Sequence, residues 1–100
     1  MDANFMQMLQ GAQQKIEESK KRLDSLAVEA EAENGAVKIV INGNKKVVRI
    51  ELSDAIVKEA DKEHLEDVIL VAINRALEKA EKLSESEMHQ AAMGLIPGIM

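Results

Sequence analysis

The chain of 100 residues contains no cysteine, tryptophan or tyrosine, and Phe5 is its single phenylalanine. Without cysteine it has no disulfide, no thiolate nucleophile and no zinc knuckle, which agrees with a reducing compartment. Because aromatic residues are nearly absent, we expect a core of Ile, Val, Leu, Ala and Met. The length is that of one domain, so we predict one core and no second module.

The chain also lacks long apolar segments. Residues 1–4 contain no basic region followed by an apolar one, and no apolar run approaches the roughly 20 residues that span a bilayer. We therefore expect a cytoplasmic protein with no membrane partner.

Residues suited to catalysis are scarce. The two histidines, His64 and His89, fall about 37 Å apart along one predicted helix, so they do not share a site within a protomer. His64 with Asp67 offers too few ligands for a metal ion. The sequence has no nucleophile elbow and no glycine-rich phosphate loop. We predict a protein that is not an enzyme and has no cofactor, metal site or catalytic residues.

The net charge is −5, from 18 acidic and 13 basic residues, which taken whole argues against a nucleic-acid binder. The positive charge is local, however. It lies between Lys15 and Arg22 and within residues 37–53, whereas residues 54–100 are acidic. A local basic patch binds phosphate on an acidic protein when the acids face elsewhere, so nucleic acid remains a candidate partner.

Residues 28–53 predict three strands. Val or Ala alternates with Glu over residues 28–33, Asn34-Gly35 makes a turn, and a β-hairpin follows with Asn42-Gly43-Asn44 at its tip, where positive φ is needed. Alternation places the hairpin's apolar residues on one face of each strand: Val37, Ile39 and Ile41, then Val48, Ile50 and Leu52. Glu29, Glu31, Glu33, Lys38, Arg49 and Glu51 fall on the wet face. We expect strands at about 28–34, 36–42 and 45–53, forming an antiparallel meander.

Long helical patterns flank the strands. A heptad seam predicts a helix over about 4–27 that lies along another long helix and against the sheet. Its positions are Phe5, Leu9, Ala12, Ile16, Ser19, Leu23 and Leu26. Asp61 is a plausible N-cap for a second helix over about 62–93, followed by a tail, residues 94–100. The predicted fold class is α+β, in the order α-β-β-β-α.

The first half of the second helix has almost no polar face between Leu65 and Leu77. A helix that is apolar nearly all round is buried nearly all round, and one small sheet cannot do this alone. We therefore predict a homodimer. The expected interface residues are Leu65, Val68, Ile69, Ala72, Ile73, Ala76 and Leu77. Asn74 is a candidate for fixing register across the interface, or a partly exposed amide.

In this order and spacing, the chain resembles the YbaB/EbfC family of bacterial nucleoid-associated proteins. The motifs that carry the resemblance are Val37-Lys38-Ile39-Val40-Ile41-Asn42-Gly43 with Ile50-Glu51-Leu52-Ser53, then Leu65-Glu66-Asp67-Val68-Ile69 leading into residues 72–81, and Gly94-Leu95-Ile96-Pro97-Gly98. The resemblance implies a tweezer-like homodimer whose helical arms bind double-stranded DNA in the nucleoid, organising or bending it and influencing gene expression.

The resemblance places the DNA contacts on the helices, whose basic residues include Lys15, Lys20, Lys21, Arg22, Arg75, Lys79 and Lys82. These side chains are candidates for phosphate contact. A second interpretation is that they form ion pairs one helical turn apart, such as Glu17 with Lys21, Glu18 with Arg22 and Glu78 with Lys82. The basic residues of the hairpin, Lys38, Lys45, Lys46 and Arg49, are expected to discourage edge pairing, which needs no ligand.

A second functional hypothesis follows from the acidic net charge. The protein would be a non-catalytic interaction module of the replication or repair machinery, binding replication or recombination proteins, with DNA affinity incidental. The apolar tail, residues 94–100, is either a docking segment or a disordered end.

Overall fold

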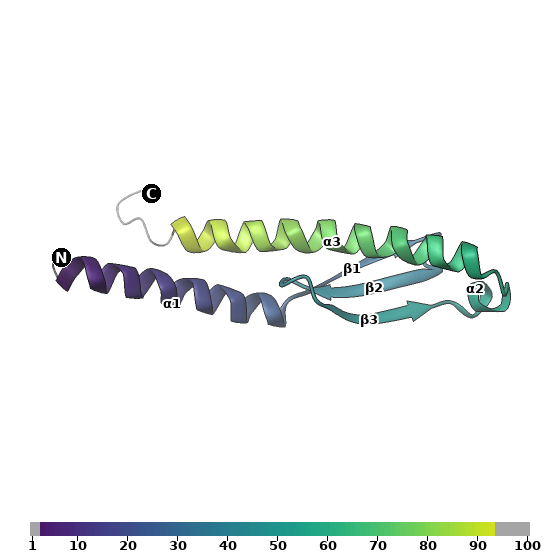
Figure 1. Ribbon diagram of the computed structural model, residues 1–100, viewed down its shortest axis with the longest axis horizontal. Coiled ribbons are helices and arrows are strands. Elements are labelled where there is room, and N and C mark those ends of the chain that lie inside the picture. Colours follow the sequence, from purple (N-terminus) through teal and green to yellow (C-terminus); the bar gives the residue numbers. More distant parts are fainter. Residues whose placement is uncertain (1–2, 94–100) are drawn as a thin grey trace.

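The computed structural model describes residues 3–93. The elements are α1 (Ala3–Ser25), β1 (Ala27–Ala32), β2 (Val37–Asn42), β3 (Val47–Leu52), α2 (Asp54–Lys58) and α3 (Lys62–Met93) (Figure 1). The predicted order of a helix, three antiparallel strands and a long helix is confirmed. The long helix α3 has the predicted bounds. The first helix ends at Ser25 rather than near residue 27, and β3 begins later than predicted because residues 43–46 form the preceding turn.

The sheet has the order β1-β2-β3, and α3 packs across one of its faces. The central strand supplies the most deeply buried side chains, since Val37, Ile39 and Ile41 are all inaccessible to solvent. Small residues face them from α3, where Ala72 and Ala76 let the helix approach the sheet closely. The prediction of an aliphatic core on this face of β2 is confirmed.

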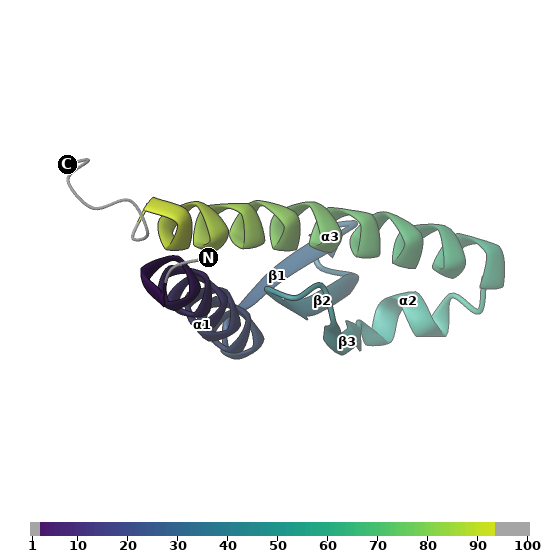
Figure 2. The same ribbon diagram turned by 60° about the vertical axis from the view of Figure 1, so that its left-hand side comes forward.

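The outer strand β3 is exposed along its whole length. Pairing places Ile50 opposite Ile39 and Leu52 opposite Val37, so both point to the core side of the sheet. They remain 46% and 38% exposed because α3 lies over β1 and β2 instead. Figure 2 shows β3 as the strand farthest from α3.

The predicted face of Val48 is wrong, because the pairing between β2 and β3 shifts in register. The alternation predicts that Val48 shares a face with Ile50 and Leu52, but the residue paired with Ile41 is Val47, and Val40 pairs with Arg49. An extra residue at this irregularity breaks the period of two. Val47 therefore takes the place on the core side that the alternation assigns to Val48.

The short helix α2 was not predicted. Ser53 begins it, and the Ser53 hydroxyl accepts a hydrogen bond from the backbone N–H of Ile56 at 3.2 Å. Ile56 is buried in the core cluster beside the apolar face of α3. The predicted N-cap of α3 is confirmed, because Asp61 Oδ1 accepts from the N–H of His64 at 3.1 Å.

The β2–β3 turn, residues 43–46, lies against the end of α1. The backbone N–H of Gly43 donates to the carbonyl oxygens of Leu23 and Leu26 at 2.9 and 3.0 Å. The residue with positive φ is Lys45, at 66°, rather than one of the three residues Asn42-Gly43-Asn44. Gly43 is required for a different reason: it leaves room for the side chain of Leu23.

The two long helices run side by side beyond the sheet, with α1 beneath the C-terminal part of α3 (Figure 1). The predicted seam of α1 is buried at Ser19 and Leu23, which confirms packing against another helix over this half. Towards its N-terminus the same seam is exposed, because Phe5 and Leu9 lie 48% and 45% exposed within the described residues. We call α1 together with residues 83–93 of α3 the arm.

Replacing Gly43 with alanine should destabilise the fold, because the added Cβ would lie 2.5 Å from Cδ2 and 2.9 Å from Cβ of Leu23. We expect the free energy of unfolding to fall by about 1–3 kcal/mol, measured by urea denaturation at fixed protein concentration. Gly11→Ala is the matched control, since nothing lies within 4 Å of its Cβ position. This control should stabilise α1 by up to about 1 kcal/mol. Equal effects of the two changes would contradict the close approach.

Candidate nucleic-acid interface

Two of the seven predicted DNA-contacting side chains tie α3 to the outer edge of β1. Arg75 Nη1 donates to the carbonyl oxygen of Glu31 at 3.0 Å, and Lys79 Nζ donates to that of Glu29 at 2.7 Å. These hydrogen bonds satisfy backbone acceptors at the edge of the sheet. The structure therefore gives Arg75 and Lys79 a role within the protomer.

A third predicted contact, Arg22, joins the two helices of the arm. Its Nη1 lies 2.8 Å from Oε1 of Glu87, whose side chain is only 10% exposed. Removing a carboxylate from water is costly unless it is paired, so this ion pair fixes α1 against α3. Ser19 lies beside it in the same crevice, where its small side chain admits the helices.

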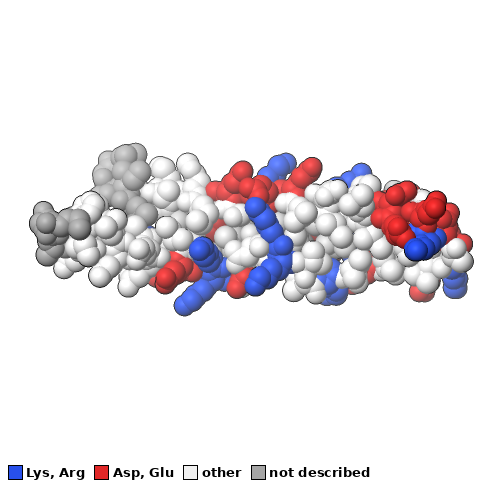
Figure 3. Space-filling view, in the orientation of Figure 1, with Lys and Arg blue, Asp and Glu red and all other residues white. Residues whose placement is uncertain are grey.

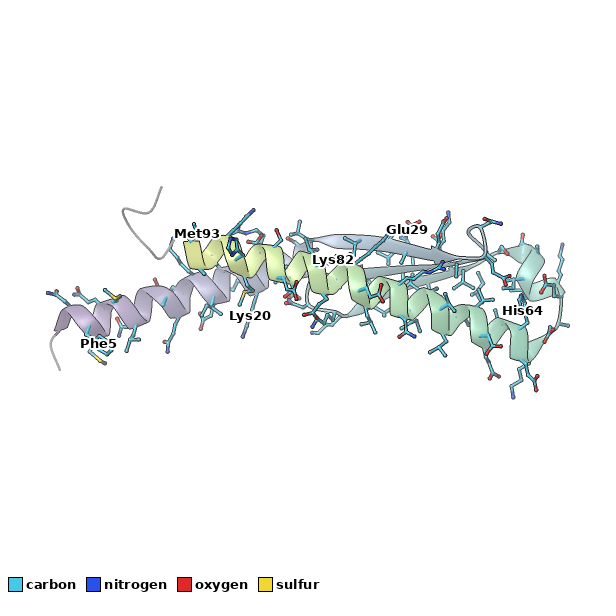
Figure 4. The ribbon with its side chains drawn as sticks, turned by 90° about the horizontal axis from the view of Figure 1, so that it is seen from above. Phe5, Lys20, Glu29, His64, Lys82 and Met93 are labelled. Carbon is cyan, nitrogen blue, oxygen red and sulfur yellow. The ribbon has the colours of Figure 1, made fainter. Side chains whose placement is uncertain are left out.

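The four remaining candidates are exposed lysines, and within residues 3–93 none of them has a hydrogen bond or ion pair through its ammonium group. They are Lys15, Lys20, Lys21 and Lys82. The alternative pairs of Glu17 with Lys21 and Glu78 with Lys82 are not formed in this part of the chain. Figure 4 shows Lys20 and Lys82 near the middle of the long axis, far from His64.

The lysines of α1 lie on different sides of the helix. Lys15 lines the crevice between α1 and α3 together with Glu18, Arg22 and Glu87. The backbone of Lys20 lies beside the β2–β3 turn, because its carbonyl oxygen accepts a hydrogen bond from Asn44 Nδ2 at 2.9 Å. Helical spacing turns its side chain about 140° round the helix from that of Lys15. The stretch from Lys15 to Arg22 is thus not one continuous basic face.

Charge is unevenly distributed along the molecule. In Figure 3 the basic side chains gather over the middle, around the end of α1 and the β2–β3 turn. One group of acidic side chains lies beside them along α3, and another lies at the α2 end. Residues 54–67 contribute six of these acids and two lysines. The middle therefore offers the more favourable potential for a polyanion.

The predicted dimer-interface residues fall into two sets. Val68, Ala72 and Ala76 are buried against the chain's own sheet, so they belong to the core of the protomer and are not available to a partner. Leu65, Ile69 and Ile73 are half-buried, and Leu77 is exposed. Asn74 is exposed.

An exposed apolar surface, which we call the α3–β3 surface, extends from α3 to β3. Arg75 and Lys79 hold one flank of α3 over β1, so helical spacing turns the other flank, with Ile73 and Leu77, towards β3. Leu70 lies farther round the helix, away from the sheet, and is 59% exposed. The surface continues over the core side of β3, with Val47, Ile50 and Leu52.

An ionisable pair, His64 with Glu33, lies at the N-terminal end of α3. His64 Nε2 lies 3.0 Å from Oε2 of Glu33 in the β1–β2 turn and 3.8 Å from a carboxylate oxygen of Glu59. The hydrogen bond and charge of Glu33, with smaller contributions from Glu59 and Asp61, raise the pKa of His64 above its ordinary value. Within the described residues no group of three or more His, Cys, Asp or Glu side chains is arranged to hold a metal ion.

The raised pKa of His64 predicts a pH-dependent contribution to stability. Because the folded-state pKa exceeds the unfolded value of 6.5, the contribution is fully present below about pH 6.5 and is lost as pH rises through the folded pKa. In an NMR titration, Glu33→Gln should lower the pKa of His64. The stability difference between the wild type and this variant should shrink as the pH rises. An unchanged titration of His64 would contradict the pairing.

Sequence patterns did not identify three residues that shape this surface: Asn44, Glu87 and Leu70. Asn44 donates to Lys20 O and, at 2.6 Å, to Asp24 Oδ1, which places the turn beside α1. Glu87 is a buried acid among mostly exposed neighbours near the C-terminal end of α3. Leu70 is the most exposed apolar residue of α3. A helical wheel centred on Ala72 and Ala76 would have separated Leu70 from the core, whereas nothing local marks Asn44 or Glu87.

Similarity to known proteins covers nearly the whole chain. Residues 1–95 match the model of the YbaB/EbfC DNA-binding family. A nucleoid-associated protein of Thermoanaerobacter sp. is 45% identical over 100 residues, covering 96% of this chain and 90% of the relative. A nucleoid-associated protein of Flavobacterium johnsoniae is 39% identical over 98 residues, covering 95% and 91%. The crystal structure of an uncharacterized Helicobacter pylori protein shares the fold, with a TM-score of 0.80 at 17% identity over 92% and 98% of the two chains.

Proposed function

The chain belongs to the YbaB/EbfC DNA-binding family, and from this membership we propose that it is a nucleoid protein whose homodimer binds double-stranded DNA through phosphate contacts. The relatives named above support the nucleoid assignment. The prediction that it is not an enzyme agrees with a family described by DNA binding. Within residues 3–93, no helix is long and apolar enough to cross a membrane.

The observation that carries the DNA-binding proposal is the set of exposed lysines on α1 and α3 whose ammonium groups have no partner within residues 3–93. Lys20 and Lys21 lie on the last turns of α1, away from the acidic residues 54–67 at the α2 end of the molecule. Lys82 is flanked on α3 by Glu78, Glu81 and Glu85, so its net contribution is smaller. Lysines that contact phosphate release counterions, which makes such binding depend steeply on salt.

The α3–β3 surface supports the homodimer. Its apolar side chains lie on the core side of β3 and on α3, and no element of the described chain covers β3. A second copy offers the same surface, as a two-fold symmetric interface requires. In such a dimer, burial of Leu70, Leu77 and Ile50 would stabilise the assembly, and the two arms would be related by the two-fold axis.

Ile50→Asp should shift the protein towards monomer, because the dimer would bury a carboxylate of the α3–β3 surface without a partner. We expect the dimer dissociation constant to rise by at least about tenfold, roughly 1.4 kcal/mol, measured by analytical ultracentrifugation. Arg49→Asp places the same new side chain on the opposite, charged face of β3 and is the matched control. A wild-type protein that sediments as a monomer at micromolar concentration would overturn the homodimer.

Lys21→Glu should weaken binding to every duplex by a similar factor, because phosphate contacts carry no sequence information. Fluorescence anisotropy titrations from about 50 to 200 mM salt should show the salt slope reduced by about one for each phosphate that the variant no longer neutralises. Lys58→Glu, the same change at the end of α2, is the control and should bind as the wild type does.

The same titration tests the alternative function. If the wild type binds no duplex at about 50 mM salt, the DNA-binding proposal fails. A protein partner that persists after nuclease treatment would then favour an interaction module.

A further inference from the structure

We propose that the β2–β3 turn, residues 43–46, is a second DNA-contacting element, which joins the end of α1 in one composite phosphate-binding surface. This inference rests on the proposed function and deepens it, since it adds the sheet body to contacts otherwise assigned to the helices. The added side chain is Lys46, with Lys45 as its neighbour.

The turn is held rigidly where α1, α3 and the sheet meet. Asn44 Nδ2 donates to Lys20 O and to Asp24 Oδ1 of α1, and Lys45 Nζ forms an ion pair with Glu81 of α3. Within the turn, Asn42 Oδ1 accepts from the N–H groups of Asn44 and Lys46 at 2.9 and 3.1 Å. A turn fixed by so many contacts loses little conformational entropy when it binds a ligand.

The contacts that fix the turn also bring positive charge together. The turn lies against the last turns of α1, so the backbones of Lys45 and Lys46 lie near that of Lys20, and Figure 3 shows basic side chains over this junction. Glu81 pairs with Lys45, and Asp24 is bonded to Asn44. Lys20 and Lys46 are exposed, and within residues 3–93 neither ammonium group has a partner. Two such groups suit the phosphates of a single backbone.

Protection of a sheet edge does not explain these lysines. The edges of the sheet are β1 and β3, and the residues of the turn precede β3 and are covered on one side by α1. Arg49, on β3 itself, is the basic residue placed to discourage edge pairing. A second structural explanation is that lysines near the C-terminal end of α1 offset its dipole, and this explanation predicts an effect on stability instead of on DNA affinity.

The test uses the full chain and a double-stranded oligonucleotide in fluorescence anisotropy titrations over a range of salt concentrations. Lys46→Ala should weaken binding severalfold at about 50 mM salt and lower the salt slope by about one, the share of a single neutralised phosphate, with little change in thermal stability. Lys58→Ala is the matched control at the acidic end of the molecule and should match the wild type in both measurements.

A second measurement does not depend on substitution. In amide NMR spectra, addition of DNA should shift the resonances of Gly43, Asn44 and Lys46 and leave that of His64 unchanged. If the wild type binds DNA but Lys46→Ala binds equally well and the turn resonances do not move, this inference is wrong while the proposed function stands. If Lys46→Ala lowers thermal stability without changing affinity, the dipole explanation replaces it. If the wild type binds no duplex, both fail.

Discussion

The width of a single helix relative to a three-stranded sheet is the constraint on which the rest of this structure depends. Strands lie about 4.8 Å apart and a helix with its side chains is about 10–12 Å across, so one helix covers two strands and leaves the third. Hydrogen bonds from Arg75 and Lys79 to β1 decide which strand is left, because they hold α3 at that side of the sheet. The uncovered strand is β3, and the apolar side chains on its core side remain exposed.

The position of α3 over β1 also explains which basic side chains make contacts within the chain. Side chains on the β1 flank of α3 are used to attach the helix, and Arg22 is used to attach α1 to α3 through Glu87. The basic side chains that remain accessible to an external anion are concentrated near the end of α1 and the β2–β3 turn. The acidic net charge of the chain is compatible with a polyanion as partner, since six of the acids lie at the α2 end, within residues 54–67.

Sequence periodicity could predict much of the fold. Alternation in β2 and the N-cap of α3 are local signals, and Ile39, Ile41 and Asp61 all take the predicted roles. The register shift that exchanges Val47 for Val48 could not be predicted, because it depends on pairing between strands. The short helix α2 could not be predicted from periodicity either, since five residues give no measurable period.

The candidate site was less accessible to sequence reasoning than the fold. A basic side chain looks the same in a sequence whether it will meet a phosphate, as proposed for Lys21, or a backbone carbonyl, as Arg75 does. Only the position of α3 over β1 separates the two outcomes. Arg22 is a similar case. It pairs with Glu87, far along the chain, instead of with the local partner Glu18, because α1 packs against α3.

The close packing of Gly43 against Leu23 restricts how the β2–β3 turn can vary in length. Surface connections between strands ordinarily accept inserted or deleted residues with little cost. Here the connection is held against α1 by hydrogen bonds and against α3 by the ion pair of Lys45 with Glu81. Lengthening it by one amino acid would carry Asn44 past its acceptor, so homologues that differ here should differ in the angle at which α1 leaves the sheet.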